Sequence, residues 1–214
     1  MSNSRRTLPL WQKMAPGTQL VFLYLYYAEN TGSVNLTQIA KALSLSKATC
    51  TRAINDLSAS GLISQTAEGT NKWITTAYTK SELLEKAYGR LKTPVDRILY
   101  VKGTAQIEHP IASGIRALAR QSMIGVNDQD GAIAISKKEA AKIPAEDICT
   151  KQYFEDFGGA VIEVWSYDPI ILERDGCVDD ISLLLSMDND PNERVQTCLD
   201  EIRQKHGLPI KEEE

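Results

Sequence analysis

The amino-acid sequence predicts an α+β protein of two domains, in which a helical N-terminal domain ending in a β-hairpin is followed by a smaller mixed α/β C-terminal domain. The chain has 214 residues, a length that suits one large or two small domains. Up to Val95 it has 11 Lys and Arg against 5 Asp and Glu, and from Asp96 it has 13 against 23. Helical patterns dominate the first part, whereas strand and helix patterns alternate in the second.

The first helices of the N-terminal part follow from apolar spacing and capping. Residues Thr18–Tyr27 are apolar on most sides, which indicates a helix with neighbours on several faces. A polar break follows, and Asn35 with Gln38 then has the form of a capping box. The next helix is expected over Leu36–Leu43. Its apolar residues form one stripe at i, i+3, i+4 and i+7: Leu36, Ile39, Ala40 and Leu43.

A second short helix is expected directly after a tight turn. Ser46 is a good N-cap, and the helix should span Lys47–Ser58. Its core stripe is Cys50, Ile54 and Leu57, with Ala53 beside it. The opposite stripe is Ala48, Thr51, Arg52 and Asn55. Small and hydrogen-bonding side chains of this kind can approach a DNA groove closely, whereas a merely solvated face more often has Glu and Lys pairs.

A β-hairpin is expected after this helix. Gly61 ends the helix as a left-handed cap, and strands Leu62–Thr66 and Lys72–Thr76 flank a polar tip. Helix, helix-turn-helix and hairpin in this order make a winged helix. The stretch Leu36–Ile63 resembles the core of bacterial winged-helix transcription regulators, and the resemblance extends over Thr18–Tyr78. It implies that the second helix of the pair reads the major groove of double-stranded DNA and that the wing lies along the sugar-phosphate backbone of the DNA.

The resemblance places two groups of residues at or near DNA. The wing residues are Asn71 and Lys72, with Thr70, whereas Glu68 at the tip argues against deep insertion. Arg52 is the strongest candidate, because its guanidinium can bind guanine bidentately. The alternative is an ion pair between Arg52 and Asp56, one turn on. The helix residues are Ser46, Lys47, Thr49, Thr51, Arg52 and Asn55.

The N-terminal residues and the domain boundaries complete the organisation. Arg5 and Arg6 could form a minor-groove arm or simply a frayed terminus. The expected domains are an arm (1–13), a winged helix (14–79), a linker helix (80–95, helical over Lys80–Leu91) and an acidic effector or dimerisation domain (96–214). In that last domain the patterns predict strands over 97–101, 132–135 and 160–167, and helices over 111–122, 137–143 and 191–206.

Catalytic chemistry is hard to find in this sequence, and we expect no enzyme, no metal and no cofactor. Four scattered cysteines and two histidines give neither a zinc-site spacing nor a triad. Five of the acids from Asp168 to Asp190 could suggest a divalent-metal site, but the segment Asp188–Glu193 is better explained as a turn and N-cap before the last helix. Glu163 lies on a strand as nuclease carboxylates do, but Trp165 stands where a lysine would be needed. Lacking a membrane span or the apolar region of a signal peptide, the chain is expected to be cytoplasmic.

A second resemblance concerns the C-terminal half. The segments Thr93–Val101, Gly114–Ala119 and Glu163–Pro169 are similar to those of regulators with a C-terminal effector domain, including abortive-infection antitoxins and autorepressors. This implies a protein partner, such as a cognate toxin, or dimerisation. The leading hypothesis is a DNA-binding transcription regulator, a homodimeric repressor. The alternatives are a protein-interaction scaffold or antitoxin and, less favoured, a metal-dependent nucleic-acid enzyme.

Overall fold

The structure, a computed structural model, describes residues 12–28, 34–68, 71–103, 106–125 and 131–210. The chain divides into an N-terminal unit (residues 1–92 with 206–208) and a C-terminal unit (93–205 with 209–214). The C-terminal unit is the longer one, so the expectation of a smaller second domain was wrong. Within the described ranges, every helix is too short or too polar to cross a lipid bilayer.

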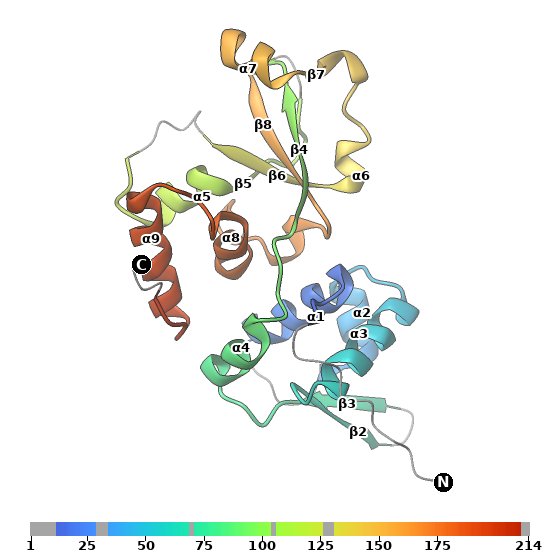
Figure 1. Cartoon of the computed structure of the whole chain (residues 1–214). Helices are drawn as coiled ribbons and strands as arrows, with labels where there is room; N and C mark the ends of the chain where they lie inside the picture. The colour runs from blue at the N-terminus through green and yellow to red at the C-terminus, as the bar shows by residue number, and fades with distance from the viewer. Residues whose placement is uncertain (1–11, 29–33, 69–70, 104–105, 126–130, 211–214) are drawn as a thin grey trace. The chain divides into compact units, whose positions relative to one another are not determined.

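The N-terminal unit has the winged helix-turn-helix architecture that the sequence predicts (Figure 1). Its three strands form an antiparallel sheet in the order β1-β3-β2, in which β2 and β3 are the wing hairpin. The strands are β1 (Val34–Asn35), β2 (Ser64–Glu68) and β3 (Asn71–Thr75). The helices are α1 (Pro16–Tyr27), α2 (Leu36–Ala42), α3 (Lys47–Ala59) and α4 (Lys80–Tyr88).

Local capping signals fix where α2 and α3 begin and end. The predicted capping box is confirmed, because Asn35 Oδ1 accepts the Gln38 N–H at 2.9 Å and Gln38 Oε1 accepts the Asn35 N–H at 3.1 Å. Gly61 has φ of +74°, the left-handed conformation expected of it. It completes a Schellman motif, in which the Leu62 N–H donates to the Leu57 carbonyl at 3.0 Å and the Gly61 N–H donates to that of Ser58 at 3.1 Å.

The turn between α2 and α3 is a second Schellman motif, built around a serine. Ser44 has φ of +51°, the Leu45 N–H donates to the Ala40 carbonyl at 3.0 Å, and the Ser44 N–H donates to that of Lys41 at 3.3 Å. A side chain in this conformation is strained, because its Cβ approaches the following carbonyl. The turn therefore keeps the two helices close at a cost in stability.

We expect opposite effects from substitutions at these two turns. Gly61→Ala should lower the free energy of unfolding by about 1 kcal/mol, and Ser44→Gly should raise it by about 0.5 kcal/mol. The added Cβ of Gly61→Ala meets nothing within 4 Å, so backbone strain is its only cost.

Gly89→Ala is the control, since Gly89 has φ of −60° and equally open space around it. Urea denaturation measures all three, and a loss at Gly89 equal to that at Gly61 would contradict the explanation.

The core of the N-terminal unit lies between α1 and the buried stripes of α2 and α3. On α3 the predicted stripe is confirmed, as Cys50, Ala53, Ile54 and Leu57 are all buried. On α2 the stripe is buried except for Leu36, which is half-buried. Helix α1 is buried on most sides, as expected, and α4 packs Leu83, Leu84 and Ala87 within the same unit.

The C-terminal unit is built on a five-stranded mixed sheet in the order β5-β6-β8-β4-β7, in which β6 and β8 are parallel and the other pairs antiparallel. Its strands are β4 (Val95–Val101), β5 (Ile111–Ala112), β6 (Ala132–Ser136), β7 (Ile148–Cys149) and β8 (Ala160–Trp165). Its α-helices are α5 (Gly114–Gln121), α6 (Lys137–Ala140), α7 (Lys151–Phe157), α8 (Asp180–Met187) and α9 (Glu193–Lys205). The described part of this unit also has 3-10 turns at Ala145–Asp147 and Pro169–Leu172.

The two faces of this sheet differ in chemistry. Apolar residues of β6 and β8 pack with Ala140 of α6 into one core cluster on the first face. On the other face Glu163 is buried, and its Oε2 accepts hydrogen bonds from Ser113 Oγ at 2.6 Å and Trp165 Nε1 at 3.0 Å. The position that argued against a nuclease on sequence grounds thus contributes a hydrogen-bond donor to Glu163.

The secondary structure of the C-terminal half differs from the sequence-based prediction at two places. The helix expected over 111–122 begins only at Gly114, because Ile111 and Ala112 pair with β6 as β5. Helices α7 and α8 are not predicted by the sequence pattern. Helix α8 is capped by Asp179, whose side chain accepts the Ser182 N–H at 3.0 Å, so this acid has a structural role.

Candidate nucleic-acid interface

The candidate interface is the exposed side of α3. Ser46 caps the helix as predicted, with its Oγ accepting the Thr49 N–H at 3.1 Å. Ala48, Arg52 and Asn55 are exposed and Thr51 is half-buried. These four residues, called the recognition face below, lie opposite the buried stripe, as the helical spacing predicts. Lys47 is also exposed, at the first position of the helix.

Three hydroxyl groups at the start of α3 make hydrogen bonds within the helix and its cap. Thr51 Oγ1 donates to the Lys47 carbonyl at 2.8 Å, and Ser46 Oγ lies 2.9 Å from Thr49 Oγ1. The methyl group of Thr49 faces α1, because a Cβ added at Gly17 would lie 2.9 Å from it. These three residues therefore shape the start of the helix, and Lys47, Arg52 and Asn55 supply the accessible donor groups.

The alternative partner of Arg52 is engaged elsewhere. Asp56 Oδ1 accepts a hydrogen bond from Arg90 Nη2 at 2.9 Å, and Arg90 also donates through Nε to the Gln12 carbonyl at 3.0 Å. The side chain of Arg90 is only 3% exposed. The alternative role for Arg52, an ion pair with Asp56, is therefore wrong. Among the described residues the Arg52 guanidinium has no carboxylate partner.

Of the wing residues predicted to contact DNA, the structure describes only the backbones of Asn71 and Lys72. The backbones of Asn71 and Lys72 lie in β3 opposite Glu68 and Ala67 of β2, but their side chains lie outside the described part of the structure. Thr70, Arg5 and Arg6 are also outside the described ranges. The wing adds one residue that was not among the sequence-predicted contacts, since Gln65 Nε2 donates to Asn55 Oδ1 at 3.4 Å.

Cys50 lies on the buried side of α3, where its Sγ donates to the Leu36 carbonyl at 3.7 Å. Burial raises the pKa of the Cys50 thiol, so the thiol stays protonated at neutral pH and packs as an apolar group. In the part of the chain that the structure describes, no three His, Cys, Asp or Glu side chains cluster as metal ligands would.

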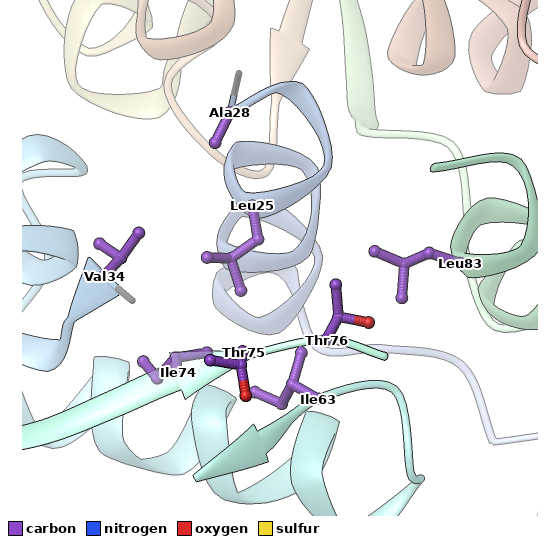
Figure 2. A pocket seen from close by; sticks show the side chains of 8 residues that line it. All are labelled: Leu25, Ala28, Val34, Ile63, Ile74, Thr75, Thr76 and Leu83. Atoms are coloured by element: carbon purple, nitrogen blue, oxygen red, sulfur yellow. The ribbon is translucent and has the colours of Figure 1, made fainter. Parts of the chain in front are cut away.

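A small apolar pocket lies between the wing sheet and helices α1 and α4 (Figure 2). Leu25 of α1, Leu83 of α4 and Ile74 of β3 border it, together with Ile63 and Val34. Its volume is about 20 Å³, which is room for one water-sized molecule. The pocket is therefore a gap in the packing and not a ligand site of useful size.

Residues 18–72 match the sequence model of the MarR family. The match covers about a quarter of the chain and ends within β3, so the antitoxin resemblance of the C-terminal half still rests on short motifs. No curated protein and no solved structure matches the chain. The capped α3, its exposed face and the hairpin after it agree with the family match. Residues 18–72 are thus similar to the winged helix-turn-helix of MarR-family DNA-binding transcription regulators.

Proposed function

We propose that the protein is a transcriptional repressor that reads the major groove of double-stranded DNA with α3. The observation that carries the proposal is the recognition face, which offers an exposed guanidinium that has no carboxylate partner among the described residues. A guanidinium can bind guanine O6 and N7 bidentately, and Lys47 at the start of the helix can meet phosphate. Among the sequence-predicted contacts, Asn55 is the second candidate for a base edge. Asn71 and Lys72 remain candidates for phosphate contacts at the wing.

A homodimer follows from the size of the recognition element. One recognition helix reads a short half-site, so useful affinity requires two modules related by a two-fold axis and a palindromic operator. We propose that the acidic C-terminal unit supports this dimer or receives a signal, because a surplus of carboxylates repels DNA phosphates. Light scattering of the full-length protein, free and on operator DNA, tests the dimer. A protein that stays monomeric in both states would refute it.

Salt dependence distinguishes DNA binding from the alternative of a protein-docking scaffold. Phosphate contacts release counterions, so the logarithm of the binding constant for random duplex should fall linearly with the logarithm of the salt concentration. Fluorescence anisotropy of a labelled duplex, measured from about 50 to 200 mM salt, gives the slope. A slope near zero, or no binding at low salt, would contradict the proposed function.

Arg52→Ala should weaken operator binding by about 1 to 3 kcal/mol without affecting folding. If Arg52 reads a base, specificity at one base pair should relax; if it meets phosphate, binding should weaken for all sequences and the salt slope should fall by about 1. Arg97→Ala removes the same charge from an exposed arginine of the C-terminal unit and serves as the control. Unchanged operator affinity of Arg52→Ala would remove this residue from the interface.

A further inference from the structure

The side chain of Gln65 reaches α3 from the wing. Gln65 is the second residue of β2 and pairs with Ile74 of β3. Along an extended chain every second side chain shares a face, so Gln65 is on the same face as Ile63, which is buried. This face is turned toward α3, and Gln65 Nε2 donates to Asn55 Oδ1 at 3.4 Å. The neighbouring residues on the strand, Ser64 and Thr66, are exposed.

The hydrogen bond from Gln65 determines what Asn55 can offer to DNA. A free asparagine amide presents one acceptor oxygen and one NH2 group, and it reads adenine by using both. Here one of the two lone pairs of Oδ1 accepts from Gln65, which turns this oxygen toward the wing and leaves the Nδ2 group on the outer side of the amide. An NH2 group recognises the acceptors of the major groove, which are N7 and O6 of guanine, N7 of adenine and O4 of thymine.

We infer that Gln65 is a positioning residue that holds the Asn55 amide with its NH2 group outward, so that Asn55 recognises a base edge offering an acceptor. The inference rests on the proposed reading of DNA by α3, and it deepens that proposal by making a wing residue part of the sequence code. Asn55 is exposed and Gln65 is half-buried, so their hydrogen bond adds little to folding stability. Its effect lies in the orientation of the amide.

Two substitutions at Gln65 make opposite predictions for base preference. Gln65→Lys keeps a donor toward Asn55 Oδ1, so the preference should stay as in the unaltered protein. Gln65→Glu offers only acceptors, so Asn55 must donate to the carboxylate and turn Oδ1 outward. At the base pair that Asn55 reads, the preference should then shift by about 5-fold or more toward edges offering a donor, adenine N6 or cytosine N4.

The experiment is selection from a library of randomised duplex DNA with the full-length protein, followed by sequencing. Asn55→Ala identifies the base pair that Asn55 reads, because its preference should vanish there. Thr66→Glu is the matched control for Gln65→Glu, since it adds the same negative charge at a neighbouring exposed position and should weaken binding to all sequences alike. Thermal unfolding checks that each variant folds.

The failure of this inference and the failure of the proposed function give different results. The inference is overturned if Gln65→Glu changes affinity but has the same base preference as Thr66→Glu, or if Gln65→Lys loses the preference. The proposed function itself is contradicted if the unaltered protein enriches no sequence and Arg52→Ala changes nothing.

Discussion

Replacing Arg90 with methionine should lower the free energy of unfolding of the N-terminal unit by about 2 to 4 kcal/mol. The guanidinium is almost fully buried, and its ion pair with Asp56 fastens the connection after α4 to α3. Methionine fills much of the same volume, but it leaves the Asp56 carboxylate, whose side chain is 21% exposed, without its cation. It also leaves the Gln12 carbonyl without the donor that Arg90 Nε provides.

The measurement is hydrogen exchange of the α3 amides at increasing denaturant, which reports the opening of this unit. Arg52→Met is the matched control, since it removes an exposed arginine from the same helix that Asp56 occupies and should change stability by no more than about 0.5 kcal/mol. The two arginines should therefore have opposite phenotypes, with Arg52 affecting DNA binding and Arg90 affecting stability. Equal stability losses in the two variants would contradict this division.

Trp165→Ala should lower the free energy of unfolding of the C-terminal unit by about 3 to 5 kcal/mol. Trp165 is among the largest fully buried side chains of the described residues, at 1% exposure, and its ring meets that of Tyr167 edge-on with centroids 5.8 Å apart. Truncation leaves a cavity and removes the Nε1 donor from the buried Glu163 carboxylate. Both consequences act in the same direction.

Two further variants separate these contributions. Trp165→Phe keeps an aromatic ring but lacks the N–H donor, so it should be intermediate between the unaltered protein and Trp165→Ala. Phe157→Ala is the control, because Phe157 of α7 is 73% exposed and its loss should cost less than about 1 kcal/mol. Guanidinium denaturation followed by far-ultraviolet circular dichroism measures all three. An effect of Phe157→Ala equal to that of Trp165→Ala would show that burial does not set the cost.

Part of the candidate site could be predicted because its signals are local in the chain. The Asn35–Gln38 capping box, the Ser46 cap and the left-handed Gly61 are each decided within one helical turn, and the structure confirms all three. The exposed and buried sides of α3 follow in the same way from the helical period. A helix of this pitch can bury only one stripe, so the apolar residues identify the opposite face.

The assignments that failed depend on residues far apart in the sequence. Asp56 had a plausible partner one turn away in Arg52, but its cation comes from Arg90, 34 positions along the chain. Periodicity also could not tell Ile111 and Ala112 from the first turn of α5, because pairing with β6 is what makes them a strand. Nothing local to Asn55 indicates that Gln65 would reach its amide.

The sequence by itself therefore determined the order of helices and hairpin, the helix caps and the face that α3 exposes, since hydrogen bonds and side-chain spacing between residues close together in the chain set these features. Only the tertiary structure decided which arginine is buried and which is accessible, how the amide of Asn55 is held, and that Glu163 accepts hydrogen bonds from Trp165 and Ser113. These depend on which elements pack together. Packing selects among partners that the local sequence leaves equally possible, because a buried charge or amide must find its hydrogen bonds wherever the fold brings a donor or acceptor.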